Sequence, residues 1–128
     1  MAALSIDPEP ASGNVEFDSQ ALLERIEGDR NLLKELIGIF LDDIPGLIFE
    51  LGDGIMQGNA GVVEKTAHAI RGSCAMMSVQ GLEKLTHQLE IMGKTGKLAG
   101  ADAEYQRVVA SFDDIRRIMK SLLESMTP

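Results

Sequence analysis

The chain has 128 residues, of which 45% are hydrophobic, so it is large enough for one packed domain and too small for two. Its formal net charge of −8 argues against nucleic acid as the main partner, because binding a phosphate backbone needs a basic surface. No apolar run is long enough to span a membrane, and prolines and acidic residues interrupt the N-terminus where a secretory signal would lie. We therefore expect a soluble cytoplasmic protein, and its single cysteine fits a reducing compartment.

The first predicted helix is short. Asp18 has the position of an N-cap, with Phe17 before it and Leu22 four residues after it, which is the spacing of a hydrophobic staple. Glu27 and Gly28 are typical of a helix end, so the pattern predicts a helix of two to three turns.

The second predicted helix is long and contains a proline. It begins after the N-cap Asp29 and ends at Gly58 and Asn59. Pro45 predicts a kink or a break, and a nearly continuous helix is favoured because the apolar stripe keeps its phase across the proline. This stripe consists of Leu33, Ile37, Phe40, Ile44, Leu47, Leu51 and Ile55.

Three further amphipathic helices follow. They are predicted at about 60–78, from Leu82 to a glycine-rich end at 93–96, and from Tyr105 to Met126. Their stripes, spaced by three or four residues, are Val63, Ala67, Ile70, Cys74 and Met77; Leu82, Leu85, Leu89 and Met92; and Tyr105, Val108, Phe112, Ile115, Met119, Leu122 and Met126.

No segment alternates with the period of two that a half-buried strand requires, so the sequence predicts no sheet. Four long amphipathic helices with short connections predict an all-α, antiparallel four-helix bundle, with the short first helix added at its N-terminus. Residues 1–14, rich in Pro, Ala, Ser and Gly, are expected to form a flexible tail, and 15–128 the bundle domain.

One histidine lies in an unusual position on the third predicted helix. His68 follows the striped Ala67 by one position, about 100° around the helix, and so lies at the border of the buried face. Small residues, Gly72 and Ala75, follow it at i+4 and i+7 on the same face, while Lys65 and Arg71 flank it. A neutral imidazole on an open surface between two cations has what phosphoryl transfer needs, namely a nucleophile and positive charge near the phosphoryl oxygens.

The other candidate groups offer less. Cys74 lies on the apolar stripe and is expected to be a buried small hydrophobe. His87 lies opposite the stripe of its helix with no small residues around it, so we expect a solvated surface residue. The sequence contains no phosphate-binding glycine loop, no Cys-x-x-Cys pair and no His-Glu-x-x-His helix, and a metal- or haem-binding bundle that uses both histidines is disfavoured by their opposite exposure.

The residues around His68 resemble a known family. AHAIRGSCA, residues 67–75, is similar to the motif of histidine-containing phosphotransfer (HPt) domains, in which the phospho-accepting histidine is followed three residues later by Lys or Arg and then by Gly and a small residue. GDRNLLKELIGIFLDDIP resembles the second helix of the family, and GLEKLTHQLE resembles the helix after the motif. The resemblance covers about residues 17–125. The family often has glycine where Ser78 stands, so the turn after the third helix is expected to differ.

The resemblance implies that His68 accepts a phosphoryl group from a receiver-domain aspartate, or from a kinase, and passes it to another receiver. Arg71 would take the place of the usual lysine. The expected partners are response-regulator receiver domains and a sensor or hybrid histidine kinase. No cofactor is implied, Mg²⁺ being expected only in the partner receiver, and we expect a monomeric phosphocarrier that does not phosphorylate itself with ATP.

Two alternative functions differ in how well they fit the sequence. The dimerisation domain of a sensor kinase has an acidic residue directly after its histidine and a proline soon after, but here Ala69 follows His68 and the next proline is Pro128, so that reading is rejected. A helical interaction module that binds receivers or kinases without phosphorylation stays open. The sequence leaves undetermined which partners are used, the pathway, the direction of phosphate flow, and whether the chain was excised from a larger hybrid kinase.

Overall fold

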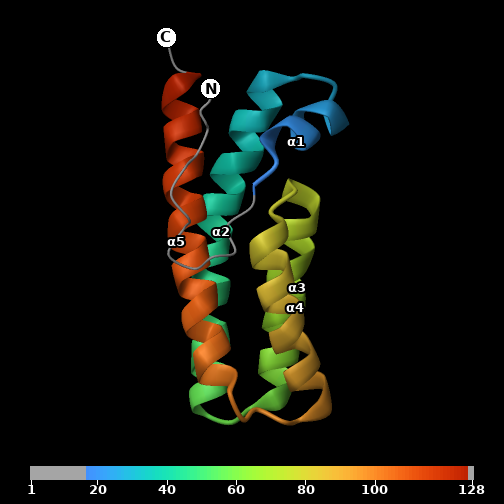
Figure 1. Cartoon of the computed structure of the whole chain (residues 1–128), viewed down its shortest axis with the longest axis vertical. Coiled ribbons are helices and arrows are strands. Elements are labelled where there is room, and N and C mark those ends of the chain that lie inside the picture. The colour runs from blue at the N-terminus through green and yellow to red at the C-terminus, as the bar shows by residue number, and fades with distance from the viewer. Residues whose placement is uncertain (1–16, 127–128) are drawn as a thin grey trace, which may run out of the picture.

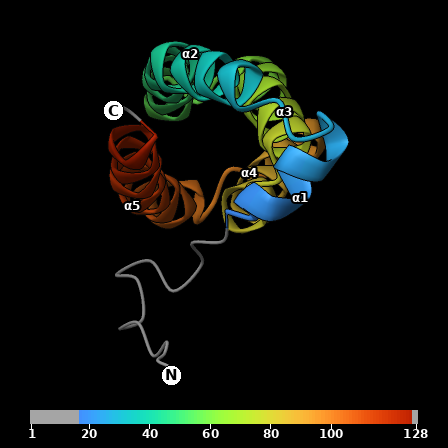
Figure 2. The ribbon, with the colours of Figure 1, turned by 90° about the horizontal axis from the view of Figure 1, so that it is seen from above.

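The described part of the chain is a bundle of five helices, shown in Figure 1. The computed structural model describes residues 17–126. The helices are α1 (Ser19–Arg25), α2 (Arg30–Met56), α3 (Ala60–Met77), α4 (Gln80–Thr95) and α5 (Ala101–Ser125). The four long helices run alternately up and down, and seen from above they surround one core (Figures 1 and 2). The short helix α1 lies against α2 and the C-terminal end of α3. The predicted all-α, antiparallel four-helix bundle with a short additional helix is confirmed. The predicted tail, 1–14, lies outside the described residues.

Local sequence explains where three of the helices begin. Asp18, Asp29 and Asn59 each accept a hydrogen bond at a side-chain oxygen from the backbone N–H three residues later, at 2.9, 3.0 and 3.2 Å. Each bond satisfies one of the donors that the first turn of a helix leaves without a partner. The N-caps that the sequence predicts at Asp18 and Asp29 are thus confirmed.

The long helix α2 continues through Pro45, as expected. Beyond the proline the buried face differs in two positions from the predicted stripe. Near the end of α2, Gly54 is buried and the predicted Ile55 is only partly buried. Earlier in the helix the difference concerns two adjacent residues. Ile48 is buried and Leu47 only partly so. Both residues fit a spacing of three or four between Ile44 and Leu51, so periodicity alone does not distinguish them, and the packing of α2 against its neighbours decides which one enters the core.

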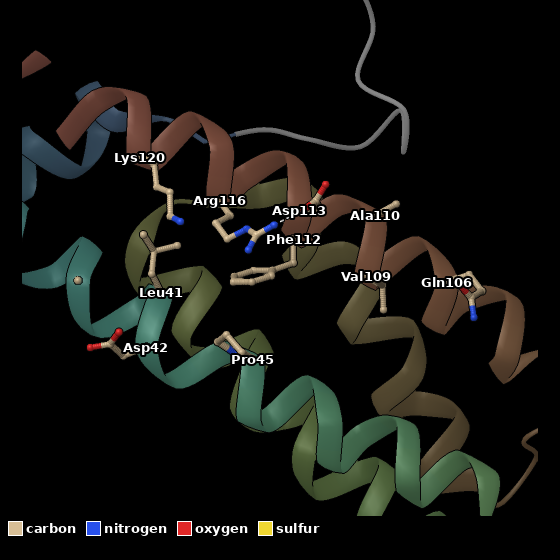
Figure 3. Close-up of a pocket in the computed structure, with 11 residues that line it drawn as sticks. Leu41, Asp42, Pro45, Gln106, Val109, Ala110, Phe112, Asp113, Arg116 and Lys120 are labelled. Atoms are coloured by element: carbon tan, nitrogen blue, oxygen red, sulfur yellow. Dashed lines mark hydrogen bonds and ion pairs between the residues drawn. The ribbon is translucent and has the colours of Figure 1, made fainter. Parts of the chain in front are cut away.

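The helices α3 and α4 pack most closely where Gly93 faces α3. A Cβ atom at Gly93 would lie 2.7 Å from Cα of Glu64, so only a glycine allows the two backbones to approach this far. Between α2 and α5 the packing is looser, and a hollow opens between Leu41 and Pro45 on one helix and Phe112 on the other (Figure 3). Within the described part of the chain no helix is long and apolar enough to cross a membrane.

The turn between α3 and α4 depends on Ser78. Its backbone is left-handed, with φ 60° and ψ 41°, a conformation that glycine adopts most easily. Hydrogen bonds from α1 and from the residue before it hold this turn in place. The N–H of Asp18 donates to the carbonyl of Ser78 at 2.9 Å. Arg25 of α1 donates to the Ser78 hydroxyl and, at 3.3 Å, to the carbonyl of Ala75. The short first helix therefore secures the end of α3.

Candidate functional site

His68 projects from the middle of α3 into solvent. Its side chain is 64% exposed, whereas Ala67 and Ile70 beside it in the sequence are fully buried. The position at the border of the buried face follows from the helical period, since 100° separates one residue from the next. An imidazole held here by a packed helix is accessible to another protein without any movement of the core.

A carboxylate of the neighbouring helix contacts this imidazole. Oε2 of Glu90, on α4, lies 2.8 Å from Nδ1 of His68. Oε1 of the same carboxylate accepts a hydrogen bond at 2.5 Å from Nε of Arg71, whose Nη2 lies 3.3 Å from Nδ1 of His68. Three side chains from two helices therefore form one cluster, with Glu90, only 14% exposed, at its centre.

The charges in this cluster determine the protonation of the histidine. The hydrogen bond from Arg71, with a second from His68, lowers the pKa of Glu90 to about 2, and the same bond raises the pKa of Arg71. Glu90 is therefore ionised at neutral pH and can only accept hydrogen bonds. Because Nδ1 lies 2.8 Å from this acceptor, the contact favours the tautomer with its proton on Nδ1, in which the lone pair is on Nε2.

The surface beside His68 is open on the side away from α4. Gly72 and Ala75 are both exposed, and a Cβ atom at Gly72 would meet nothing within 4 Å. The open surface that the sequence predicts along this face is thus present. Lys65 is also exposed, but among the described residues it forms no hydrogen bond or ion pair, so the structure joins only Arg71 of the two predicted cations to His68.

Two residues of α4 near His68 were not predicted to lie there. Glu90 carries no motif that marks it in the sequence, although it follows the striped Leu89 by one position, just as His68 follows Ala67. His87 is exposed, as expected, with 52% of its side chain accessible. Its Nδ1 is 3.8 Å from Oε1 of Glu90. A recess opens between it and α3, lined by Arg71, Gln80, Glu83, Lys84 and His87.

The remaining nucleophile is buried. Cys74 is fully enclosed, and burial raises the pKa of its thiol, so a reactive thiolate does not form there at neutral pH. Among the described residues no cluster of three or more His, Cys, Asp or Glu side chains has the arrangement of a metal site.

Comparisons with known proteins agree with this geometry. The family model of the Hpt domain matches residues 35–123, more than half of the chain. The crystal structure of histidine-containing phosphotransfer protein B (HptB) from Pseudomonas aeruginosa PAO1 is similar with a TM-score of 0.81 and 22% sequence identity, over 87% of this chain and 96% of that chain, which shows a shared fold. No curated protein sequence matches significantly. From the extent of the family match, the chain belongs to the Hpt domain family and is a phosphorelay component that carries phosphoryl groups rather than an enzyme.

Proposed function

We propose that His68 is the residue that carries the phosphoryl group. Nε2 attacks the phosphorus of an aspartyl phosphate in a receiver domain, a P–N bond forms, the P–O bond to the aspartate breaks, and the aspartate leaves as a carboxylate. Nδ1 keeps its proton, so the ring becomes positively charged as the bond forms. The reverse step delivers the phosphoryl group to the aspartate of a second receiver.

The observation that carries this proposal is the contact between Glu90 and Nδ1. A carboxylate 2.8 Å from Nδ1 holds the proton on that nitrogen, leaves Nε2 as the nucleophile, and opposes the positive charge that the ring acquires. No described residue forms a hydrogen bond with Nε2. Glu90 thus acts as a positioning residue, in the manner of a carboxylate that orients a catalytic imidazole.

Arg71 has two functions in this proposal. It holds the carboxylate of Glu90 at 2.5 Å, and it places a permanent cation beside the imidazole. Charge on the transferring phosphoryl group is spread over its three equatorial oxygens, and a cation near them stabilises the transition state. We assign no comparable role to Lys65, which lacks such a contact.

The receiver would dock on the open side of α3. Next to Gly72 and Ala75 lies Met76, 59% exposed, and across a small apolar hollow lies Ile39 of α2, 56% exposed. Exposed apolar side chains beside a reactive group are typical of a surface that binds another protein. The partners would be receiver domains and a sensor or hybrid kinase of the cytoplasm, the Mg²⁺ belonging to the receiver, and the protein would work as a monomer.

The test is transfer of label from a phosphorylated receiver to the purified protein. Wild-type protein should acquire an acid-labile, base-stable label within seconds. His68→Gln should abolish labelling, His87→Gln should remain labelled, and Glu90→Gln should be labelled more slowly because the carboxylate charge is lost. Labelling of His68→Gln at the wild-type level would overturn the assignment.

A further inference from the structure

Two histidines of this protein lie on either side of one carboxylate. Nδ1 of His68 is 2.8 Å from Oε2 of Glu90, and Nδ1 of His87 is 3.8 Å from Oε1. The first distance is that of a hydrogen bond, and the second is too long for one. His87 is one turn before Glu90 on α4, so a small rotation of its exposed side chain brings the two groups into contact.

Few other charges face His87. On its own helix these are Glu83 and Lys84, one turn earlier, and Glu90; from α3 the guanidinium of Arg71 lines the same recess. The formal charges of these two carboxylates and two cations balance. Histidine is the side-chain type whose charge commonly changes between about pH 5 and 8, so a proton added to His87 is a change of charge that this cluster can undergo near neutral pH.

We propose that His87 is a positioning residue that makes phosphoryl transfer at His68 sensitive to pH in the neutral range. When His87 is protonated, its Nδ1–H donates to Oε1 of Glu90, and the carboxylate then neutralises three cationic or donating groups instead of two. The Glu90 carboxylate then stabilises the positive charge that develops on the His68 ring less strongly, and the rate of transfer falls. When His87 is neutral, the Glu90 carboxylate accepts hydrogen bonds from His68 and Arg71 alone. This inference rests on the proposed role of His68 as acceptor.

The size of the effect follows from Coulomb's law. A unit charge added several ångströms from the reacting ring, at the high effective dielectric constant of a protein surface, changes the rate by about three- to tenfold. Protonation of His68 itself removes the lone pair and also slows transfer, so the wild-type rate should depend on two protons on the acid side. A variant with a neutral residue at position 87 should depend on one.

The experiment measures transfer from one phosphorylated receiver between pH 5.5 and 8.5, at fixed ionic strength, for wild type, His87→Gln and His87→Lys. The ratio of variant to wild-type rate at each pH cancels the titration of the receiver. For His87→Gln this ratio should rise about three- to tenfold from pH 8 to pH 6. For His87→Lys, which is charged throughout, the ratio should rise toward one as the pH falls. Lys84→Gln is the matched control, because it removes a charge from the same recess and leaves both histidines in place, and its ratio should stay constant.

Nitrogen-15 spectra of the imidazoles give a second measure that needs no transfer. The His68 ring signals should respond to two titrations in wild type and to one in His87→Gln. If the ratio for His87→Gln is constant across the pH range while His68 is labelled normally, the role of His87 is refuted and the proposed acceptor stands. If label persists in His68→Gln, the acceptor assignment fails instead.

Discussion

Substituting Gly72 should move stability and function in opposite directions. The residue lies in the interior of α3, its backbone is not left-handed, and a Cβ atom there would meet nothing within 4 Å. Gly72→Ala should therefore stabilise the fold by about 0.5–1 kcal/mol, because alanine has the higher helix propensity and restricts the unfolded chain. In a domain of this size that corresponds to a melting temperature roughly 2–5 °C higher. Gly72→Leu should also fold, since its side chain would extend into solvent.

The rate of phosphoryl transfer should fall as the side chain at position 72 becomes larger. Gly72 follows His68 by one helical turn, on the face where we place the docked receiver, so each added carbon occupies space that the receiver needs. Phosphoryl transfer requires in-line geometry, and misplacement by about 1 Å can cost about a hundredfold in rate. We expect Gly72→Ala to be several times slower and Gly72→Leu to be slower by about a hundredfold.

The assay is thermal melting and label transfer on the same preparations. Gly38→Ala provides a matched control, because Gly38 is an interior glycine of α2 with equally open surroundings and lies in the hollow between α2 and α5, apart from His68. It should raise the melting temperature without slowing transfer. Wild-type transfer by Gly72→Leu would show that this surface is not where receivers dock, and unfolding would show that Gly72 is needed for packing.

Three further predictions concern the cluster and the helix contact beneath it. Arg71→Ala should slow transfer more than it weakens receiver binding, because a cation acts mainly on charge that develops in the transition state; equal losses in transfer rate and calorimetric affinity would make Arg71 a docking residue. With a pKa lowered from 4.5 to about 2, Glu90 stabilises the folded state above about pH 4.5, and this contribution disappears as the pH falls to about 2. The melting temperature of Glu90→Gln should therefore lie below that of the wild type at pH 7 and equal it near pH 2. A difference in melting temperature that stays constant with pH would contradict the charge assigned to Glu90. Gly93→Ala should destabilise the fold by about 1–3 kcal/mol, because its Cβ would overlap Glu64, and an unchanged melting temperature would refute the close contact.

Much of the fold can be predicted from local patterns in the sequence. The apolar stripes of α3 and α4 predicted their buried faces, and side chains at Asp18 and Asp29 predicted the helix starts, because a helical period and an N-cap involve only residues a few positions apart. The start of α5 at Ala101, a turn before its first striped residue, does not follow from the pattern, since the first turn consists of two alanines and two acidic residues and adds no large apolar residue to the stripe.

The candidate site was only half predictable. His68, Arg71 and Gly72 share one helix, so their positions relative to one another follow from 3.6 residues per turn. Glu90 is 22 residues away from His68, and its carboxylate reaches the imidazole only because Gly93 lets α4 pack directly against the backbone of α3. The same packing brings His87, which looks like an ordinary surface residue in the sequence, within 3.8 Å of that carboxylate. Local periodicity determines which face of a helix a residue occupies. The register between two helices depends instead on how their surfaces pack together, and this packing places the Glu90 carboxylate beside the reactive histidine.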